Sequence, residues 1–183
     1  MRITHKAIIS FAFSTLIATG YVVTAKAQTA VYSTLIFTNR ETSIATQNDY
    51  FASAGIGFGL YSEGYQIRRV NMGLDFRGTY SPSVRFGLAG PRAELLSRRE
   101  LVRPYVEFLI GAGTDANAQG LPIGHLYYEA VGGVDVPMGR IDYRLLEFGV
   151  GKTLLNNTNT IGESYTGGNL WEVTASSGIT YRF

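Results

Sequence analysis

Apolar and polar residues alternate with a period of two along most of the chain from residue 28 onward. This period is typical of β-strands, whose successive side chains point to opposite faces of the sheet. In the clearest segment, residues 69–80, Leu74 belongs to an apolar face and Arg77 to a polar one. The alternation predicts eight strands, at residues 30–38, 50–60, 69–80, 83–95, 102–113, 126–138, 141–153 and 169–183.

Two of the predicted strands have a less regular pattern. In the fourth, the apolar side chains of Phe86 and Leu88 place Arg85 on the opposite, polar face. In the seventh, the alternation changes phase between Leu145 and Leu146, which predicts a β-bulge. An even number of strands of about ten residues, each with one apolar and one polar face, predicts an all-β fold. We expect an eight-stranded antiparallel up-and-down transmembrane β-barrel.

The connections between these strands differ in length. Long connections are predicted at residues 39–49, 114–125 and 154–168, and short turns at 62–64 and 139–140. Long loops at one end and short turns at the other are typical of outer-membrane barrels. The long segments are polar, so we expect any extracellular ligand to bind there.

The first 27 residues have the composition of a secretory signal peptide. A basic N-terminal segment precedes a long apolar stretch, and Ala25 and Ala27 supply the small residues that a signal peptidase needs before Gln28. We therefore predict cleavage after Ala27, which leaves residues 28–183 as one outer-membrane barrel domain.

Cleavage changes the charge balance of the chain. The 183 residues carry a formal charge of +2, with 16 Lys and Arg against 14 Asp and Glu. Loss of Arg2, Lys6 and Lys26 changes this charge to −1, so we expect no nucleic-acid partner. The absence of Cys excludes disulfides, thiol nucleophiles and Cys-ligated zinc.

The polar faces of the predicted strands carry eleven charged residues. They are Arg69, Arg77, Arg85, Arg144 and Arg182, with Asp75, Glu107, Glu129, Asp135, Glu147 and Glu172. Unpaired buried ions are very costly, so the near-balance of charge predicts a paired network inside the barrel, with Arg103 and Asp142 joining near the periplasmic end. An eight-stranded barrel is only wide enough for its side chains to fill, so we expect a plugged interior. A narrow ion-conducting barrel is the alternative.

Aromatic residues occur at both ends of the predicted apolar faces. Such girdles are expected at the two membrane interfaces of a transmembrane barrel. The residues near the loop ends are Tyr50, Tyr80, Tyr128 and Trp171, and those near the periplasmic ends are Tyr143, Tyr181 and Phe183.

The chain ends with apolar residues at every second position, Ile179, Tyr181 and Phe183, the last of them aromatic. This ending resembles the signal by which outer-membrane barrels are recognised for insertion. Together with the stretches at 90–92 and 103–105, it makes the chain similar to the small OmpA/OmpX-like outer membrane protein β-barrel domain family, without a peptidoglycan-binding domain after the last strand.

This resemblance implies a location in the bacterial cell outer membrane and contact with outer-membrane lipid. It also implies recognition of the C-terminal strand by the barrel assembly machinery, and a structural or surface-interaction role.

The candidate catalytic and metal-binding motifs are incomplete. We expect no catalytic residue, no metal site and no cofactor, because His125 is the single His after residue 27 and no nucleophile–base pair is recognisable. A lipid A-modifying outer-membrane enzyme remains an alternative, although the Ser expected two residues after His125 is missing. A soluble periplasmic lipocalin-like ligand binder is another, and it would place the apolar face inside the barrel.

Overall fold

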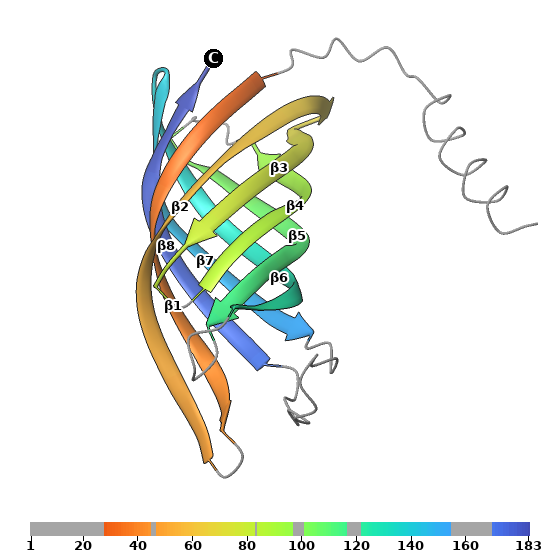
Figure 1. Ribbon diagram of the computed structural model, residues 1–183. Helices are drawn as coiled ribbons and strands as arrows, with labels where there is room; N and C mark the ends of the chain where they lie inside the picture. Colours follow the sequence, from red (N-terminus) through yellow and green to blue (C-terminus); the bar gives the residue numbers. More distant parts are fainter. Residues whose placement is uncertain (1–27, 45–46, 83, 97–100, 117–121, 155–169) are drawn as a thin grey trace, which may run out of the picture.

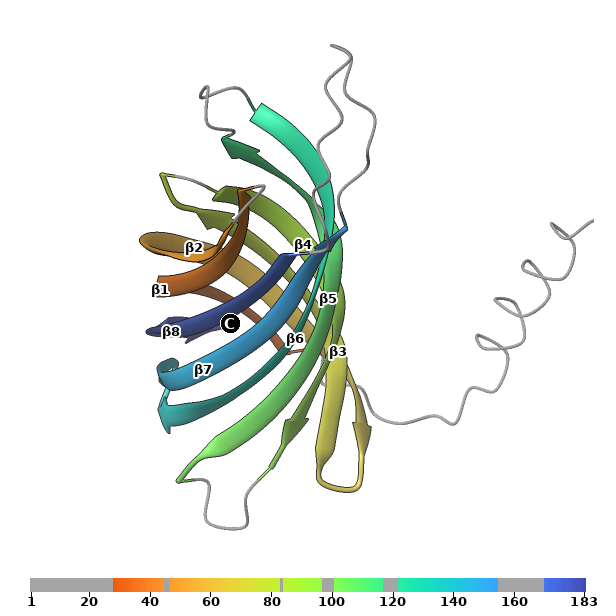
Figure 2. The same cartoon turned by 90° about the horizontal axis from the view of Figure 1, so that it is seen from below.

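The computed structural model describes residues 28–44, 47–82, 84–96, 101–116, 122–154 and 170–183. They form β1 (Gln28–Ile44), β2 (Gln47–Ile67), β3 (Val70–Tyr80), β4 (Val84–Leu95), β5 (Arg103–Ala116), β6 (Pro122–Met138), β7 (Ile141–Leu154) and β8 (Leu170–Arg182). Each strand pairs with the next, and β1 pairs with β8, so the sheet closes into a barrel (Figures 1 and 2). The predicted closed, antiparallel, all-β barrel of eight strands is confirmed. Among these residues, no helix is long and apolar enough to cross a membrane. The predicted signal peptide and its cleavage site before Gln28 fall on residues 1–27, which lie outside the described residues, so cleavage stays a prediction.

The short turns at 68–69 and 139–140 lie at the same end of the barrel as the start of β1 and the end of β8 (Figure 1). We call this end the turn end and the opposite end the loop end. The turn at 139–140 was predicted, and Gly139 has the positive φ of 87° that favours glycine.

Polarity is inverted relative to a soluble protein. On β1, Leu35 and Phe37 are each 63% exposed on the outer face, whereas Thr34 and Ile36 point inward and are 4% exposed. Every strand carries at least one large exposed apolar side chain, and the buried side chains include many charged ones. The outer wall is therefore apolar, and the interior is largely polar.

The predicted facing of β4 was wrong. Phe86 and Leu88 are buried inside the barrel, and Arg85 is exposed on the outer wall. The cause lies further along the same strand, where Arg92 and Glu94 are almost fully buried in the charged interior. All four inward residues have even numbers, and the register of β4 with β3 has no irregularity, so the phase of one half determines the phase of the other.

The β-bulge predicted in β7 is confirmed. The β7–β8 register passes from Arg144–Gly178 to Glu147–Ser176, so Leu145 and Leu146 both lie opposite Ser177. Both leucines are exposed, at 52% and 44%.

Three predicted connections were wrong in whole or in part. Of residues 114–125, residues 114–116 belong to β5 and residues 122–125 to β6, which pair as far as Ala116 and Pro122. Residues 39–49 belong mostly to β1 and β2, which pair as far as Ile44 and Gln47 and extend beyond their neighbours at the loop end (Figure 1). The polar sequence predicts a loop there, but a strand that extends past an apolar wall needs no apolar face. Residues 62–64 lie within β2, where Gly64 is the extra residue of a second irregularity, and the chain turns only at 68–69.

Interior glycines provide space for tyrosine rings of the neighbouring strand. Tyr105 on β5 lies opposite Gly133 on β6, and a Cβ added at Gly133 would meet the ring and hydroxyl of Tyr105. The adjacent Gly132 has the opposite facing, and the nearest atom to its added Cβ would be 4.0 Å away. The same strand thus has one glycine that the packing requires and one that it does not.

We therefore expect Gly133→Ala to lower the free energy of unfolding by about 1–3 kcal/mol, because the Tyr105 ring must move. The matched variant Gly132→Ala should change it by less than about 0.5 kcal/mol. Urea unfolding of both variants in lipid vesicles measures the difference. Equal losses would contradict the facing assigned to β6.

Candidate functional site

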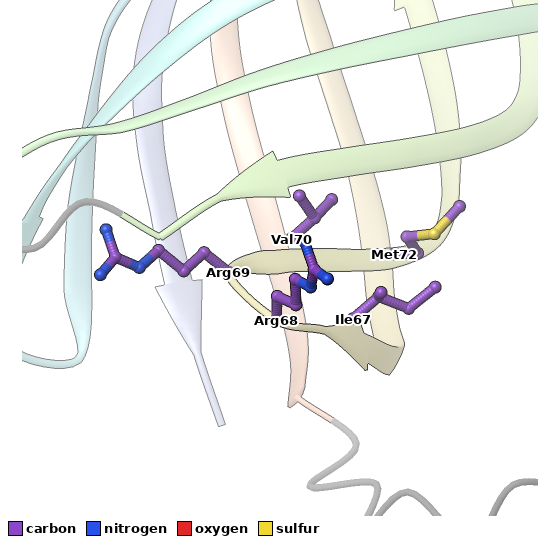
Figure 3. A pocket seen from close by; sticks show the side chains of 5 residues that line it. All are labelled: Ile67, Arg68, Arg69, Val70 and Met72. Carbon is purple, nitrogen blue, oxygen red and sulfur yellow. The ribbon is translucent and has the colours of Figure 1, made fainter.

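The barrel interior contains the main cluster of charged residues in the described part of the chain. The structure places nine of the eleven predicted network residues there, namely Asp75, Arg77, Glu107, Glu129, Asp135, Arg144, Glu147, Glu172 and Arg182, all of them buried. Arg69 and Arg85 are not in it. Arg69 lies in the turn between β2 and β3, where it points away from Arg68 at the turn end (Figure 3).

Three further buried members were not predicted: Glu63, Arg92 and Glu94. Glu63 was missed because residues 62–64 were assigned to a turn. The other two were missed because the phase of β4 was taken from its apolar half. The sequence signal that identifies them is their spacing: Arg92 and Glu94 are two residues apart, so these two charged side chains share one face of the strand.

Arg92 lies at the centre of the part of the network that is nearer the turn end. Its guanidinium lies within ion-pair distance of four carboxylates: Glu107 at 2.5 Å, Glu94 at 3.0 Å, Asp135 at 3.2 Å and Glu63 at 3.5 Å. The Cζ atom also lies 4.1 Å from the ring centroid of Tyr61 and 3.8 Å from that of Tyr105. Planar stacking on aromatic rings combined with several charged hydrogen bonds is a role that arginine fills and lysine does not.

Glu147 forms a second centre. Arg77 donates two parallel hydrogen bonds to its two carboxylate oxygens, at 2.8 and 2.9 Å. Arg144, Tyr105 and Ser176 also donate to this carboxylate, at 3.1, 2.6 and 2.8 Å. A bidentate arginine–carboxylate pair is the strongest and most directional form of this interaction.

Shared carboxylates join these centres into one network. Glu107 accepts hydrogen bonds from both Arg77 and Arg92. Asp135 accepts from both Arg92 and Arg144. At the turn end, Arg182 donates to Glu94 at 3.0 Å and to Asp142, which Arg103 also approaches. On the remaining strand, β1, the Tyr32 hydroxyl donates to Asp75 at 2.8 Å, so every strand contributes.

The expected near-balance of charge was wrong for the described residues. Nine buried carboxylates face four buried arginines and the partly exposed Arg103. Hydroxyl groups supply part of the missing donors, as Thr174 does for Glu129 at 2.6 Å. Within the described part of the chain, the interior therefore holds more carboxylates than cations.

The half of the interior nearer the loop end is less polar. Phe86 and Tyr127 stack with a centroid distance of 4.3 Å and an interplanar angle of 7°. They belong to a buried apolar cluster with Leu88, Tyr105, Leu109 and Val131. A cavity of about 10 Å³, lined by Arg77, Glu129, Glu147 and Glu172 among others, lies between this cluster and the charged network. This volume holds about one water molecule.

Aromatic side chains on the outer wall occur towards both ends. Tyr80 and Trp171 are about half exposed at the loop end, and Tyr143, Tyr181 and Phe183 are exposed at the turn end. Tyr181 and Phe183 pack edge to face, with centroids 5.2 Å apart. The side chain of the predicted girdle residue Tyr50 lies outside the described part.

A second hollow lies on the surface at the turn between β2 and β3, lined by Ile67, Arg68, Arg69, Val70 and Met72 (Figure 3). Arg68 has a positive φ of 58°, and its carbonyl accepts a hydrogen bond from Gln66. The hollow is wide open, and no carboxylate lines it. It therefore lacks the enclosed polar groups that characterise a small-molecule site.

No protein-family model matches the chain, and no curated protein sequence matches it either. Several solved structures do. Neisserial surface protein A is 16% identical, over 85% of this chain and 97% of that chain, with a TM-score of 0.48. The attachment invasion locus protein Ail of Yersinia pestis, solved with the heparin analogue sucrose octasulfate, is 10% identical over 86% and 99%, with a TM-score of 0.47. The N-terminal barrel of OprF from Pseudomonas aeruginosa is 12% identical over 86% and 100%, with a TM-score of 0.44.

This chain is similar to small outer-membrane barrels. The resemblance to OmpA/OmpX-like barrels holds at the level of the fold, because eight antiparallel strands close in chain order.

The contribution of the network to stability can be tested at Arg92. Arg92→Ala removes one of the two cations that lie within ion-pair distance of each of four buried carboxylates, and we expect the free energy of unfolding to fall by about 3–5 kcal/mol. Arg92→Lys should recover only part of this loss, since lysine lacks the planar fork. Arg85→Ala, on the same strand but exposed, should change stability by less than about 0.5 kcal/mol. Urea unfolding in vesicles provides the test, and a larger loss at Arg85 than at Arg92 would contradict the phase of β4.

Proposed function

We propose that this chain is an integral barrel protein of the bacterial outer membrane with a structural or surface-interaction role and no enzymatic activity. The observation that carries the proposal is the inverted polarity of the closed barrel. Buried ion pairs fill its interior, and apolar side chains cover its outside. A soluble lipocalin-like barrel has the opposite arrangement, so this distribution argues against that alternative.

The outer wall suits a hydrocarbon solvent in detail. A closed barrel leaves no unpaired strand edge within the wall, which is the condition for spanning a bilayer with strands. The middle of the wall carries large apolar side chains such as Leu74, Phe108 and Phe148, each at least 52% exposed. Aromatic rings towards both ends correspond to the two interfaces of a membrane.

The interior supports a plug rather than a conduit. Arg77 reaches from β3 to Glu147 on β7, so its side chain crosses the lumen. The adjoining cavity holds about one water molecule, which is too little for a hydrated ion to pass. We therefore propose that the barrel is a rigid, closed anchor that holds the connections at its loop end in place. Residues 39–49, 114–125 and 154–168 are proposed to carry any contact with an extracellular ligand.

The membrane location is tested by gel mobility. Washed outer membranes are loaded unheated and boiled, and a folded membrane barrel should show a mobility shift on heating. A protein found in the soluble periplasm, with no shift, would overturn the proposal.

A variant in the middle of the wall adds a quantitative test. Leu74 is 53% exposed at the centre of β3, so Leu74→Arg places a charge at mid-bilayer depth. We expect a loss of about 2–4 kcal/mol in folding into lipid vesicles. The apolar control Leu74→Ile should fold almost as well as the unmodified chain. An undiminished folding yield for Leu74→Arg would show that this face does not contact lipid.

We also propose that the barrel assembly machinery recognises the C-terminal strand through Ile179, Tyr181 and Phe183. All three side chains are exposed on the outer wall at the turn end, and Phe183 is 75% exposed. The backbone N–H of Phe183 donates to the Thr29 carbonyl at 3.0 Å, which holds the last residue against β1. Its side chain therefore contributes little to the barrel itself and is available for recognition.

We expect Phe183→Ser to lower the outer-membrane level of the protein severalfold in cells while leaving refolding of the purified chain in vesicles unchanged. Tyr143→Ser, which removes another exposed aromatic residue at the same end, serves as the control and should keep the normal level. Equal levels for Phe183→Ser and the unmodified protein would refute the recognition role.

A further inference from the structure

The charges on the described part of the outer surface all have one sign. All nine carboxylates with described side chains are buried in the interior. On the outward faces of the strands, the charged side chains within the described part are Arg85 and Lys152. Both lie near the loop end, since Arg85 is the second residue of β4 and Lys152 is two residues from the end of β7.

Lys152 lies in a row with two aromatic residues. It is opposite Tyr128 on β6 and Trp171 on β8, and all three side chains share the outward face. Its Nζ atom is 5.1 Å from the Trp171 ring, which is itself 51% exposed. Arg85 has a similar position across the barrel, opposite Tyr80 on β3, with its Cζ atom 4.9 Å from that ring.

The position of the row determines what it meets. Tyrosine and tryptophan rings on a membrane wall lie at the level of the lipid headgroups. A lysine between them has its ammonium at the same depth, and a cation–π contact holds it along the wall. Among the described residues, Lys152 has no carboxylate partner, so its ammonium retains its capacity to bind an external anion. The anion available at this depth is a lipid phosphate.

We propose that the Tyr128–Lys152–Trp171 row binds the headgroup phosphate of an anionic membrane lipid. Lys152 pairs with the phosphate, and the two rings pack against the adjoining glycerol and acyl groups. The Arg85–Tyr80 pair is a smaller site of the same kind. This inference rests on the proposed membrane location, and it adds a preference for lipid charge that the location alone does not require.

The chain contains its own probe for this site. Trp171 is the single tryptophan, and Lys152 is the single lysine after residue 27. Bromine atoms on lipid acyl chains quench tryptophan fluorescence only at short range, so quenching reports which lipid lies beside Trp171. The mature chain is refolded in mixed vesicles in which either phosphatidylglycerol, which is anionic, or phosphatidylcholine, which is zwitterionic, carries the bromine near the headgroup.

For the unmodified protein, we expect the anionic lipid to be enriched about fivefold beside Trp171 relative to its share of the vesicle. Lys152→Gln should abolish the enrichment, and Lys152→Arg should retain it. Arg140→Gln, which removes a cation from a turn at the opposite end of the barrel, is the matched control and should leave the enrichment unchanged.

The two proposals fail in different ways. Quenching in proportion to the composition of the vesicle, for the unmodified protein and Lys152→Gln alike, would overturn the lipid site while leaving the membrane location intact. Absence of quenching by either lipid would mean that Trp171 does not face the bilayer, and this result would overturn both proposals.

Discussion

Pairing between buried guanidinium groups and carboxylates is the interaction on which this barrel depends. A soluble domain is organised around a shared apolar core, whereas here the apolar side chains face outward and most of them do not meet each other across the lumen. The groups that do meet are Arg77, Arg92, Arg144 and Arg182 with their acidic partners. Because a buried ion without a partner is so costly, this pairing restricts the phase of every strand that carries a member. The facing of β4 illustrates the constraint, since its charged half determines where its apolar half points.

Tyrosine connects the charged network to the walls. Tyr105 stacks on Arg92, donates a hydrogen bond to Glu147 and lies over Gly133 on the neighbouring strand. One side chain thus contributes an aromatic face, a hydroxyl donor and a close fit against a backbone. Nearer the loop end than Tyr105, the Phe86–Tyr127 stack closes the interior. The lumen is consequently occupied by side chains that hold one another from several strands, which suits a rigid anchor.

Much of this architecture could be predicted from the sequence, because alternation over ten or more residues reports strand facing directly. The outward residues of β3, β5, β7 and β8 follow from it, including the change of phase at Leu145. The prediction failed where a short pattern had to be judged alone, as for Phe86 and Leu88. It also failed to identify which ions pair, since Arg77 and Glu147 are seventy residues apart and meet only across the closed lumen. The excess of carboxylates was hidden for a related reason: Glu63 lies in a segment predicted as a turn, and Glu94 lies on the strand whose facing was predicted wrongly.

The bulge in β7 has a consequence for the charged interior. Residues three apart on a regular strand face opposite sides, so Arg144 and Glu147 could not both point inward without it. The extra residue brings the two onto the same side, where they form an ion pair at 3.1 Å and each also binds partners from other strands. Leu145 and Leu146 therefore shift the inward–outward alternation of β7 by one residue, and their apolar side chains add to the outer wall. If the same sequence paired without the bulge, half of β7 would turn inside out and place charges in the wall and apolar side chains in the lumen. Deleting either leucine would instead leave Arg144 and Glu147 two residues apart on a regular strand, with both still pointing inward.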